Sequence, residues 1–411
     1  MSGPQTGQHF RFLHASDFAL DVPLAAVHAA PPSLRELMVD APYLAAERVF
    51  SAAVEERVDF LVLSGDLVDL KHASPRALAF LLDQFHRLDA AGIAVYWACG
   101  RLDPAQDWPA IAQLPKSVQV FPSLEAEELS HFRGDRPVAN IVGRSWHGTS
   151  LVQVGKFTGD TDGLTTIVVA YGQADADRMI EEEVDYWALG SQPQRRSLGS
   201  AHRVVHYPGS PQGRSLAECG PHGGTLVHVG GDRAIRTQFI PTDAVRWHNE
   251  ALAVPDNATR GEVQKLLAER IKILRSHADE RPLLVNWRLA GIEHLARPTK
   301  RHELAAELLD WLRKEYGPAK PPIWSVGVEF QPPELPAEWL EEDSMVGDYL
   351  RSLKLLEDAD AKDIDLTVHV PEPFRTAELA ALSCWTTDDH REILREAALT
   401  GSQLLGADDR D

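Results

Sequence analysis

The sequence predicts an α/β protein with two stacked β-sheets, a smaller α/β module and a helical C-terminal tail. Strands and helices alternate over the first hundred residues, short strands dominate residues 118–243, and alternation returns up to residue 332. A chain of 411 residues is also too long for a single hydrophobic core. We therefore expect three regions: residues 1–243, residues 244–332, and a linker with helices at 333–411.

The first region opens with apolar strands that end in polar turns. The strands lack polar alternation, as expected for strands buried on both faces of a sheet. Helical spacing of apolar residues at 43–57, and a second helix begun by Ser74 with proline at its first position, separate them. This order favours a parallel sheet with right-handed crossovers. The predicted strands are Phe10–Ala15, Phe60–Leu63 and Ile93–Ala98.

Residues 118–243 predict a second sheet packed on the first. Thr225–Val229 and Ala234–Ile240 flank a Gly-Gly-Asp sequence, which indicates a hairpin. Further short strands that end in glycine or polar turns are predicted at 118–121, 138–146, 165–171, 186–189 and 203–207.

Residues 244–332 predict a compact α/β module, with helices at 259–276 and 300–316. Strands are expected at 283–289 and 323–330, followed by a proline-rich linker at 331–336. The clearest helix of the tail, Thr387–Leu405, carries an apolar stripe. Core packing and partner binding both explain such a stripe, which comprises Ile393, Leu394, Ala397 and Leu404.

The bulk composition limits the partners and the compartment. The formal net charge of −20 opposes non-specific attraction to nucleic acid, so DNA binding would need a local basic patch. Three distant cysteines, Cys99, Cys219 and Cys384, fit a reducing compartment and argue against a disulfide framework. No signal peptide or long apolar run is evident, so we expect a cytoplasmic protein without a membrane partner.

Two carboxylates directly follow the Phe60–Leu63 strand. Asp66 and Asp69 lie in the turn that Gly65 begins. Sites in open α/β sheets form at the carboxyl ends of strands, and hard or borderline cations prefer oxygen ligands. A Gly-Asp pair is also ordinary turn chemistry, so a solvated loop explains these residues equally well on this stretch alone.

Four turns that each follow a strand carry a resemblance to a known family. They are Asp17-Phe-Ala, Gly65-Asp66-Leu, Gly100-Arg-Leu-Asp103 and Gly190-Ser-Gln-Pro193. Their order and flanks resemble the calcineurin-like metallophosphoesterases, in particular the SbcD-type DNA-repair exonucleases. The resemblance covers residues 10–243 and implies an α/β/β/α sandwich, and the cap module and helical tail match the family's layout.

The family's chemistry implies two Mn²⁺ or similar divalent ions that generate hydroxide and clamp the phosphate. Compared position by position, the chain retains Asp17 and the bridging Asp66. It also retains Asp103, which in the family supports the catalytic histidine, but Leu102 stands in that histidine's place. The lost metal-ligand positions are occupied by Ala19, Arg101, Tyr171, Ser191 and Pro193.

Alanine and proline cannot ligate a metal, and metal affinity falls with ligand count. We therefore expect no catalytic residue, no metal and no cofactor at this vestigial site. We also hypothesise that Arg101 replaces the metal electrostatically by facing Asp17 and Asp66. In the alternative interpretation, the Arg101 stem packs on Trp108 and its head lies in water.

Other polar residues near the turns have both a functional and a structural interpretation. Ser16 and Ser64 precede the two retained aspartates, but no histidine base for a serine nucleophile is evident. Arg195-Arg196 and the basic residues at 300–302 could contact phosphates, although short basic clusters are usually solvated. Histidines that could rebuild a metal site are His14, His72, His202 and His206.

The resulting expectation is an inactive SbcD-like protein that acts as a binding or architectural subunit. The resemblance implies an SMC-like ATPase of the SbcC type as its partner in DNA repair or DNA metabolism. One alternative is an active phosphodiesterase or DNA exonuclease with an altered site formed by Asp17, Asp66 and Asp69. Another is a nucleic-acid-binding module without catalysis, and a homodimer also remains open.

Overall fold

The computed structural model describes residues 9–157, 163–292, 295, 300–331, 335–357 and 387–405. The chain divides into two compact units. The first contains residues 1–249, 275–286 and 313–326, and the second contains residues 250–274, 287–312 and 327–411. These units do not follow the linear order of the chain, so the three predicted regions stay a prediction.

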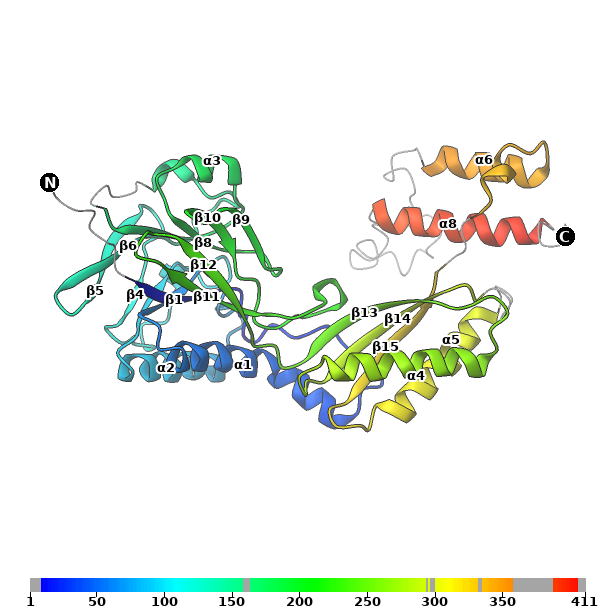
Figure 1. The fold of residues 1–411 in the computed structure, drawn as a ribbon, viewed down its shortest axis with the longest axis horizontal. Coiled ribbons are helices and arrows are strands. Elements are labelled where there is room, and N and C mark those ends of the chain that lie inside the picture. Colours follow the sequence, from blue (N-terminus) through cyan, green and yellow to red (C-terminus); the bar gives the residue numbers. More distant parts are fainter. Residues whose placement is uncertain are drawn as a thin grey trace, which may run out of the picture. The chain divides into compact units, whose positions relative to one another are not determined.

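The first sheet has the order β12-β11-β1-β2-β3-β4 (Figure 1). Strands β1 to β4 pair in parallel, while β11 pairs antiparallel with β1 and β12. This arrangement confirms the predicted hairpin around Gly-Gly-Asp. The strands are β1 Phe10–Ala15, β2 Phe60–Leu63, β3 Ala94–Trp97, β4 Val118–Val120, β11 Gly223–Val229 and β12 Ile235–Pro241.

The second sheet has the order β5-β6-β7-β8-β10-β9. Its four inner strands are parallel and its two edge strands are antiparallel. Both edge strands were absent from the sequence prediction because they are largely exposed and lack an apolar run. The strands are β5 Glu127–Arg133, β6 Arg136–Arg144, β7 Thr165–Tyr171, β8 Tyr186–Gly190, β9 Arg196–Ser200 and β10 Arg203–Tyr207.

The two sheets and their helices form the predicted α/β/β/α layers. Helices α1 (Pro32–Glu55) and α2 (Pro75–Ala90) pack on the outer face of the first sheet. Phe12, Phe60 and many other buried side chains fill the space between the sheets. Helix α3 (Ala176–Glu181) packs on the outer face of the second sheet. Short 3₁₀ helices occur at 105–107, 154–156, 216–218 and 337–340.

Helix α1 is longer than the sequence analysis predicted. It begins after Pro31, with Pro32 at its first position, and it continues through Pro42. Proline inside a helix costs about 3 kcal/mol, so Pro31, Pro32 and Pro42 concealed the first turns of this helix in the sequence. Buried Leu34 and Met38 in the first turns pack with Trp247 and other apolar residues, and this packing offsets the cost.

A third sheet has the order β13-β14-β15, and two further helices follow its first two strands. Leu267 and Leu308 are among the side chains that these helices bury. The bounds confirm the predicted order of the α/β module. They are β13 Arg246–Ala253, α4 Arg260–Ser276, β14 Leu283–Ala290, α5 Arg301–Tyr316 and β15 Ile323–Phe330.

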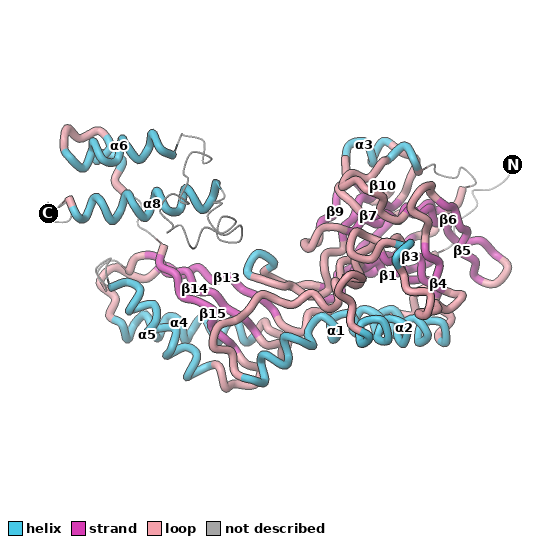
Figure 2. Tube along the Cα trace, turned by 180° about the vertical axis from the view of Figure 1, so that it is seen from behind, coloured by secondary structure: helices cyan, strands magenta, loops and turns pink. Residues whose placement is uncertain are grey.

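In the tail, α6 (Met345–Glu357) lies alongside α8 (Thr387–Leu404), as Figures 1 and 2 both show. Val346 and Leu350 are buried in this pair, and the Tyr349 hydroxyl donates to the Ala397 carbonyl at 2.8 Å. The apolar stripe of α8 is only partly covered, since Ile393 and Leu404 are exposed. Within the part of the chain that the structure describes, no helix is long and apolar enough to cross a bilayer.

Candidate functional site at the carboxyl ends of the strands

The turns that carry the resemblance lie together at one edge of the sandwich. The Asp17 amide donates to the Gly65 carbonyl at 2.9 Å, which joins the turns after β1 and β2. Tyr171, at the end of β7, and Ser191, directly after β8, complete the group through hydrogen bonds to the two aspartates. The structure thus brings Asp17, Asp66, Tyr171 and Ser191 to one site.

The backbone of these turns adopts an unusual conformation. Asp17, Ala19, Asp66 and Ser191 have φ values of 57°, 42°, 54° and 95°. Residues other than glycine rarely adopt positive φ, and such strain persists where the surrounding structure enforces it. All four occupy positions that carry metal ligands in the resembling family. Two of these four strained positions carry Asp, and the other two carry Ala and Ser.

Two glycines allow the turns to approach closely. A Cβ atom on Gly65, whose φ is 91°, would lie 2.6 Å from the Tyr171 ring. A Cβ atom on Gly100 would lie 2.3 Å from Oδ1 of Asp66. Both positions require the absence of a side chain, so the turns after β2 and β3 pack tightly around Asp66.

Hydrogen-bond donors from the chain itself surround the Asp17 carboxylate. Ser16 Oγ donates to Oδ2 at 2.6 Å, and the Ser191 amide lies 3.2 and 3.1 Å from Oδ1 and Oδ2. Burial raises the pKa of Asp17 to about 8, and the nearby Asp66 charge also raises it. Burial therefore favours the protonated form of Asp17.

Both oxygens of Asp66 are also engaged. The Leu102 amide donates to Oδ1 at 2.7 Å, and the Tyr171 hydroxyl donates to Oδ2 at 2.5 Å. Burial raises the pKa of Asp66, whereas these two hydrogen bonds and the positive charge of Arg101 lower it. Burial and the Asp66 charge raise the pKa of Tyr171 well above its usual value, so the phenol keeps its proton and remains a donor.

Asp103 has a structural function that the sequence analysis did not foresee. Its buried carboxylate accepts the amides of Asp66 at 3.0 Å, Leu67 at 2.7 Å and Gly100 at 2.6 Å. One side chain therefore joins the turn after β2 to the turn after β3. Burial and the Asp66 charge raise the pKa of Asp103 well above its usual value.

The predicted contact between Arg101 and the two aspartates is not formed. Arg101 is exposed, and in the described ranges its guanidinium forms no hydrogen bond or ion pair with Asp17 or Asp66, although its backbone amide donates to the Asp66 carboxylate. Its charge still lowers the pKa of Asp66 from a distance. The side chain that donates a hydrogen bond to Asp66 is that of Tyr171, through its phenol.

Arg214 is a site residue that the sequence analysis did not identify. Its guanidinium donates to the carbonyls of Val22 and Phe18, both at 2.5 Å, and of Ala19 at 3.0 Å. It thereby holds the turn after β1, and its charge lowers the pKa of Asp17. The flanking Pro-Gly-Ser-Pro-Gln-Gly sequence was the available signal.

The remaining candidate residues lie outside this group of hydrogen bonds. Asp69 bonds with the exposed His72 at 2.8 Å and accepts the Lys71 amide. The Pro193 carbonyl accepts the Ser210 amide. Arg195 donates to the hydroxyls of Thr225 and Thr237 and lies over the Phe239 ring, while Arg196 is exposed on β9. Lys300, Arg301 and His302 lie at the start of α5.

A histidine does lie beside Ser64, contrary to the sequence analysis. His14 Nε2 is 2.8 Å from Ser64 Oγ, and His14 Nδ1 is 3.1 Å from the Tyr186 hydroxyl. Ser64 and His14 are fully buried between the sheets, and so is His206, so no substrate can reach them. His206 bonds with Thr225, whereas His202 is exposed on the surface. These contacts belong to a polar network inside the core.

The donor set does not fit a pair of divalent ions. The site offers two carboxylates, and both oxygens of each accept hydrogen bonds from the chain itself. Ser191 Oγ is buried without a hydrogen-bond partner, which leaves one weak neutral donor. Within the described residues, no group of three or more His, Cys, Asp or Glu side chains is placed to hold a metal.

Comparison with known proteins assigns the chain to a family. A relative from Bacillus subtilis (strain 168), the uncharacterized metallophosphoesterase YhaO, is 31% identical over 296 residues, which span 68% of this chain and 71% of the relative. No protein-family model matches the chain. The chain belongs to the metallophosphoesterase family, and this membership supports a phosphoesterase-type function.

The solved structures to which the chain is similar are distant. A dimetal phosphatase from Danio rerio is 15% identical, with a TM-score of 0.33 over 57% of this chain and 99% of that chain. The phosphoesterase Yfce from E. coli is 14% identical, with a TM-score of 0.26 over 56% of this chain and 99% of that chain.

Proposed function

We propose that this chain is a catalytically inactive, SbcD-like metallophosphoesterase that acts in the cytoplasm as a binding subunit. Its partner in this proposal is an SMC-like ATPase of the SbcC type in DNA repair or DNA metabolism. The observation that carries the proposal is the occupation of both retained aspartates by donors of the chain itself. Asp17 accepts hydrogen bonds from Ser16 and Ser191, and Asp66 accepts hydrogen bonds from Leu102 and Tyr171.

The chemistry of these contacts opposes two-ion catalysis. A divalent ion at Asp66 would have to displace the Tyr171 phenol and the Leu102 amide from its two oxygens. It would also have to remove the proton of Asp17. The remaining neutral donor, Ser191 Oγ, supplies little affinity in return, because hydroxyl oxygen binds cations far more weakly than imidazole or carboxylate.

The direct test combines metal content with turnover. The chain is purified from cells grown with Mn²⁺, its metal is counted by mass spectrometry, and hydrolysis of bis-(p-nitrophenyl) phosphate is measured. We expect far less than one ion per chain and a rate that Asp66→Ala does not change. Asp69→Ala, outside the hydrogen-bonded group, is the matched control. Stoichiometric metal with turnover that depends on Asp66 would overturn the proposal.

A gain-of-function variant tests the same point from the other side. Because the positive φ angles of the turns persist, restoring the ligand side chains should restore metal binding. We expect Mn²⁺ to bind the restored variant and to remain unbound by the starting protein at equal concentration. The substitutions are Ala19→His, Arg101→Asn, Leu102→His, Tyr171→His, Ser191→His and Pro193→His.

The partner is tested by co-expression with the SMC-like ATPase of the same host. We expect a complex that survives size-exclusion chromatography and that Leu404→Glu weakens, because Leu404 is 81% exposed on α8. Val39→Glu provides a control, since Val39 is a similarly exposed apolar residue on α1. Failure of the two proteins to co-purify would refute the partnership and leave the metal result unaffected.

One observation favours a second function, a phosphodiesterase with a single ion. Ser191 Oγ is buried, lacks a hydrogen-bond partner and belongs to the residue whose amide binds Asp17. An ion held by Asp17, Asp66 and Ser191 would satisfy it. Mn²⁺-dependent turnover that is lost in Ser191→Ala would establish this function in place of the first.

A further inference from the structure

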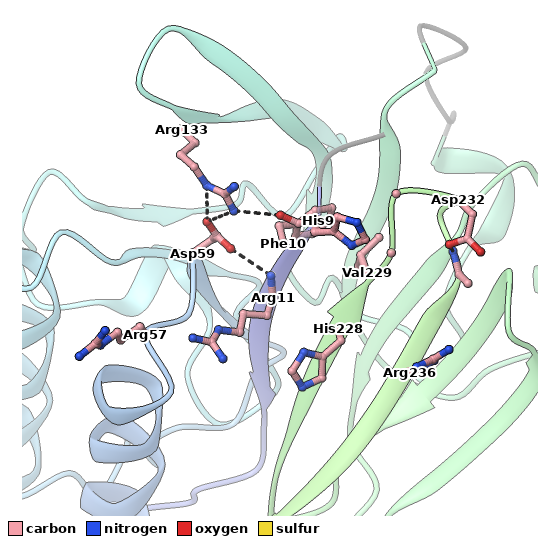
Figure 3. Close-up of a pocket in the computed structure, with 13 residues that line it drawn as sticks. His9, Phe10, Arg11, Arg57, Asp59, Arg133, His228, Val229, Asp232 and Arg236 are labelled. Atoms are coloured by element: carbon pink, nitrogen blue, oxygen red, sulfur yellow. Dashed lines mark hydrogen bonds and ion pairs between the residues drawn. The ribbon is translucent and has the colours of Figure 1, made fainter. Parts of the chain in front are cut away.

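A concave pocket of about 830 Å³ lies at the opposite end of the first sheet from the aspartate turns. It is lined by the beginning of β1, the end of α1 and the β11–β12 hairpin (Figure 3). Arg11 at the pocket and Asp17 at the turns are six residues apart, or ~20 Å at the rise of an extended strand. The pocket is therefore separate from the vestigial site.

Basic side chains form a row across the floor of this pocket. Arg11 on β1 is paired in register with His228 on β11, which is paired in turn with Arg236 on β12. Register partners lie on one face of a sheet at the spacing between strands, about 4.8 Å. Figure 3 shows Arg57, at the end of α1, extending the row beyond Arg11.

The guanidinium charges of Arg57, Arg11 and Arg236 repel one another along this row, in which His228 stands between Arg11 and Arg236. The chain as a whole carries a net charge of −20, so a gathering of arginines also departs from its average composition. Arg57 adds backbone strain, since its φ is 48°. A row that costs stability in the free protein is expected where a ligand supplies the compensating charge.

Acidic groups near the pocket leave the row largely uncompensated. The Asp59 carboxylate is occupied by the Arg133 guanidinium, at 2.9 and 2.5 Å, and by the backbone amide of Arg11. Asp232 accepts the Ala234 amide within its own turn, and its charge faces Arg236 only at longer range. Glu56 lies 3.8 Å from the Arg11 guanidinium.

The guanidinium groups of Arg57 and Arg236 are therefore available to an external acceptor, while that of Arg11 forms a partly exposed ion pair with Glu56 at 3.8 Å. Among the described residues, no hydrogen bond from the guanidinium of Arg11, Arg57 or Arg236 is present, and all three line the pocket. Arg57 and Arg236 are exposed and Arg11 is half-buried, so each is accessible from solvent. A guanidinium group binds a phosphate through two parallel hydrogen bonds. A row of guanidinium groups can therefore bind several linked phosphates, whereas a carboxylate occupies only one position.

We propose that this pocket binds a linear chain of linked phosphate groups, which lies along the row formed by Arg57, Arg11, His228 and Arg236. Such a chain presents negative charge at regular intervals, and Arg57, Arg11 and Arg236 present positive charge along the row. Two sources share this chemistry, a small inorganic polyphosphate and the backbone of a single-stranded nucleic acid. The proposal is independent of whether the aspartate turns bind a metal.

The test uses the full chain with two probes, tripolyphosphate by calorimetry and a fluorescent eight-nucleotide oligo-dT by anisotropy. We expect binding at 50 mM salt that weakens as salt rises, as for other phosphate contacts. Arg236→Ala should reduce the affinity about tenfold, and Arg11→Ala with Arg236→Ala about a hundredfold. Arg87→Ala, an exposed arginine on α2 that bonds with Ser51, is the matched control.

The outcomes separate the two sources and can refute the proposal. Tighter binding of tripolyphosphate, with displacement of the oligonucleotide, supports the pocket and assigns a small polyphosphate. Tighter binding of the oligonucleotide that the double variant abolishes supports the pocket and assigns nucleic acid. Absence of binding by both probes at 100-fold excess, or binding that the double variant leaves unchanged, overturns the proposal. Thermal unfolding of each variant verifies that the fold is intact.

Discussion

The two ends of the first sheet treat charged side chains in opposite ways. At the carboxyl ends of the strands, Asp17, Asp66 and Asp103 receive donors from the chain itself. At the other end of β1, the guanidinium groups of Arg11 and Arg236 have no hydrogen-bonded acceptor among the described residues. A closed hydrogen-bond group stabilises the fold, whereas open charges face solvent and are available to a ligand. Family membership alone points to the carboxyl ends of the strands as the functional site.

The variant with the largest expected effect at the carboxyl ends of the strands is Asp103→Ala. It removes the acceptor of three buried amides, and each unsatisfied amide costs about 1 to 3 kcal/mol, so we expect a loss of about 4 kcal/mol. Urea denaturation measures the free energy of unfolding. Asp103→Asn, which keeps one carbonyl oxygen, should lose about half as much. Asp107→Ala, at an exposed aspartate nearby, should change little, and a similar loss there would contradict the assignment.

Asp17→Asn tests the protonation of an aspartate at the carboxyl ends of the strands. Because the folded pKa of Asp17 is raised to about 8, its contribution to stability is complete below pH 4 and is lost as the pH rises to 8. The variant cannot ionise, so it should gain about 2 kcal/mol relative to the starting protein between pH 5 and pH 8.5, a reduced figure because Asp17 is partly exposed. Chemical denaturation across that range measures the difference.

The matched control for this pH series is Asp69→Asn. The hydrogen bond from His72 lowers the pKa of Asp69, so this carboxylate stabilises the fold when ionised. Its contribution is lost as the pH falls, which is the reverse of Asp17. Equal pH profiles for the two variants would show that Asp17 is not protonated in the folded protein.

Tyr171→Phe should have a smaller effect, about 1 kcal/mol, since it removes one of two hydrogen bonds to the Asp66 side chain and creates no cavity. The same variant should expose one oxygen of Asp66 and raise the affinity for Mn²⁺, measured by calorimetry. Tyr349→Phe, which removes a tyrosine hydrogen bond in the tail, controls for the general cost of losing a phenol. Unchanged Mn²⁺ affinity would mean that Tyr171 does not block the site.

Arg101→Ala should produce the smallest change, within about 0.5 kcal/mol, because Arg101 is exposed and forms no ion pair with the two aspartates. Thermal unfolding at low and high salt checks this expectation. A loss above 1 kcal/mol that salt removes would restore the hypothesis that Arg101 replaces the metal.

The sequence predicted the layers of the fold because its inner strands are apolar runs bounded by turn residues. Phe10–Ala15, Thr165–Tyr171 and Arg203–Tyr207 have the bounds that the sequence indicated. The polar edge strands β5 and β9 carry no such signal, and the prolines before α1 concealed its first turns. Hydrophobic patterning reports burial, so elements that are exposed or that begin with proline escape it.

At the site, the sequence identified which positions changed but not which contacts replaced them. Tyr171 was expected only as the residue in a lost histidine's place, and its hydrogen bond to Asp66 depends on the distance between β7 and the turn after β2. The pairing of Arg11 with His228 likewise depends on register between strands more than two hundred residues apart in the chain. Single-residue identities carry no information about such distances.

The three amides that Asp103 accepts have a consequence for motion. Loops that share one buried acceptor cannot open separately, because releasing either one leaves the same carboxylate short of donors. The segments after β2 and β3 should thus exchange their amide hydrogens with deuterium at a common rate. Opening there would be a single cooperative event.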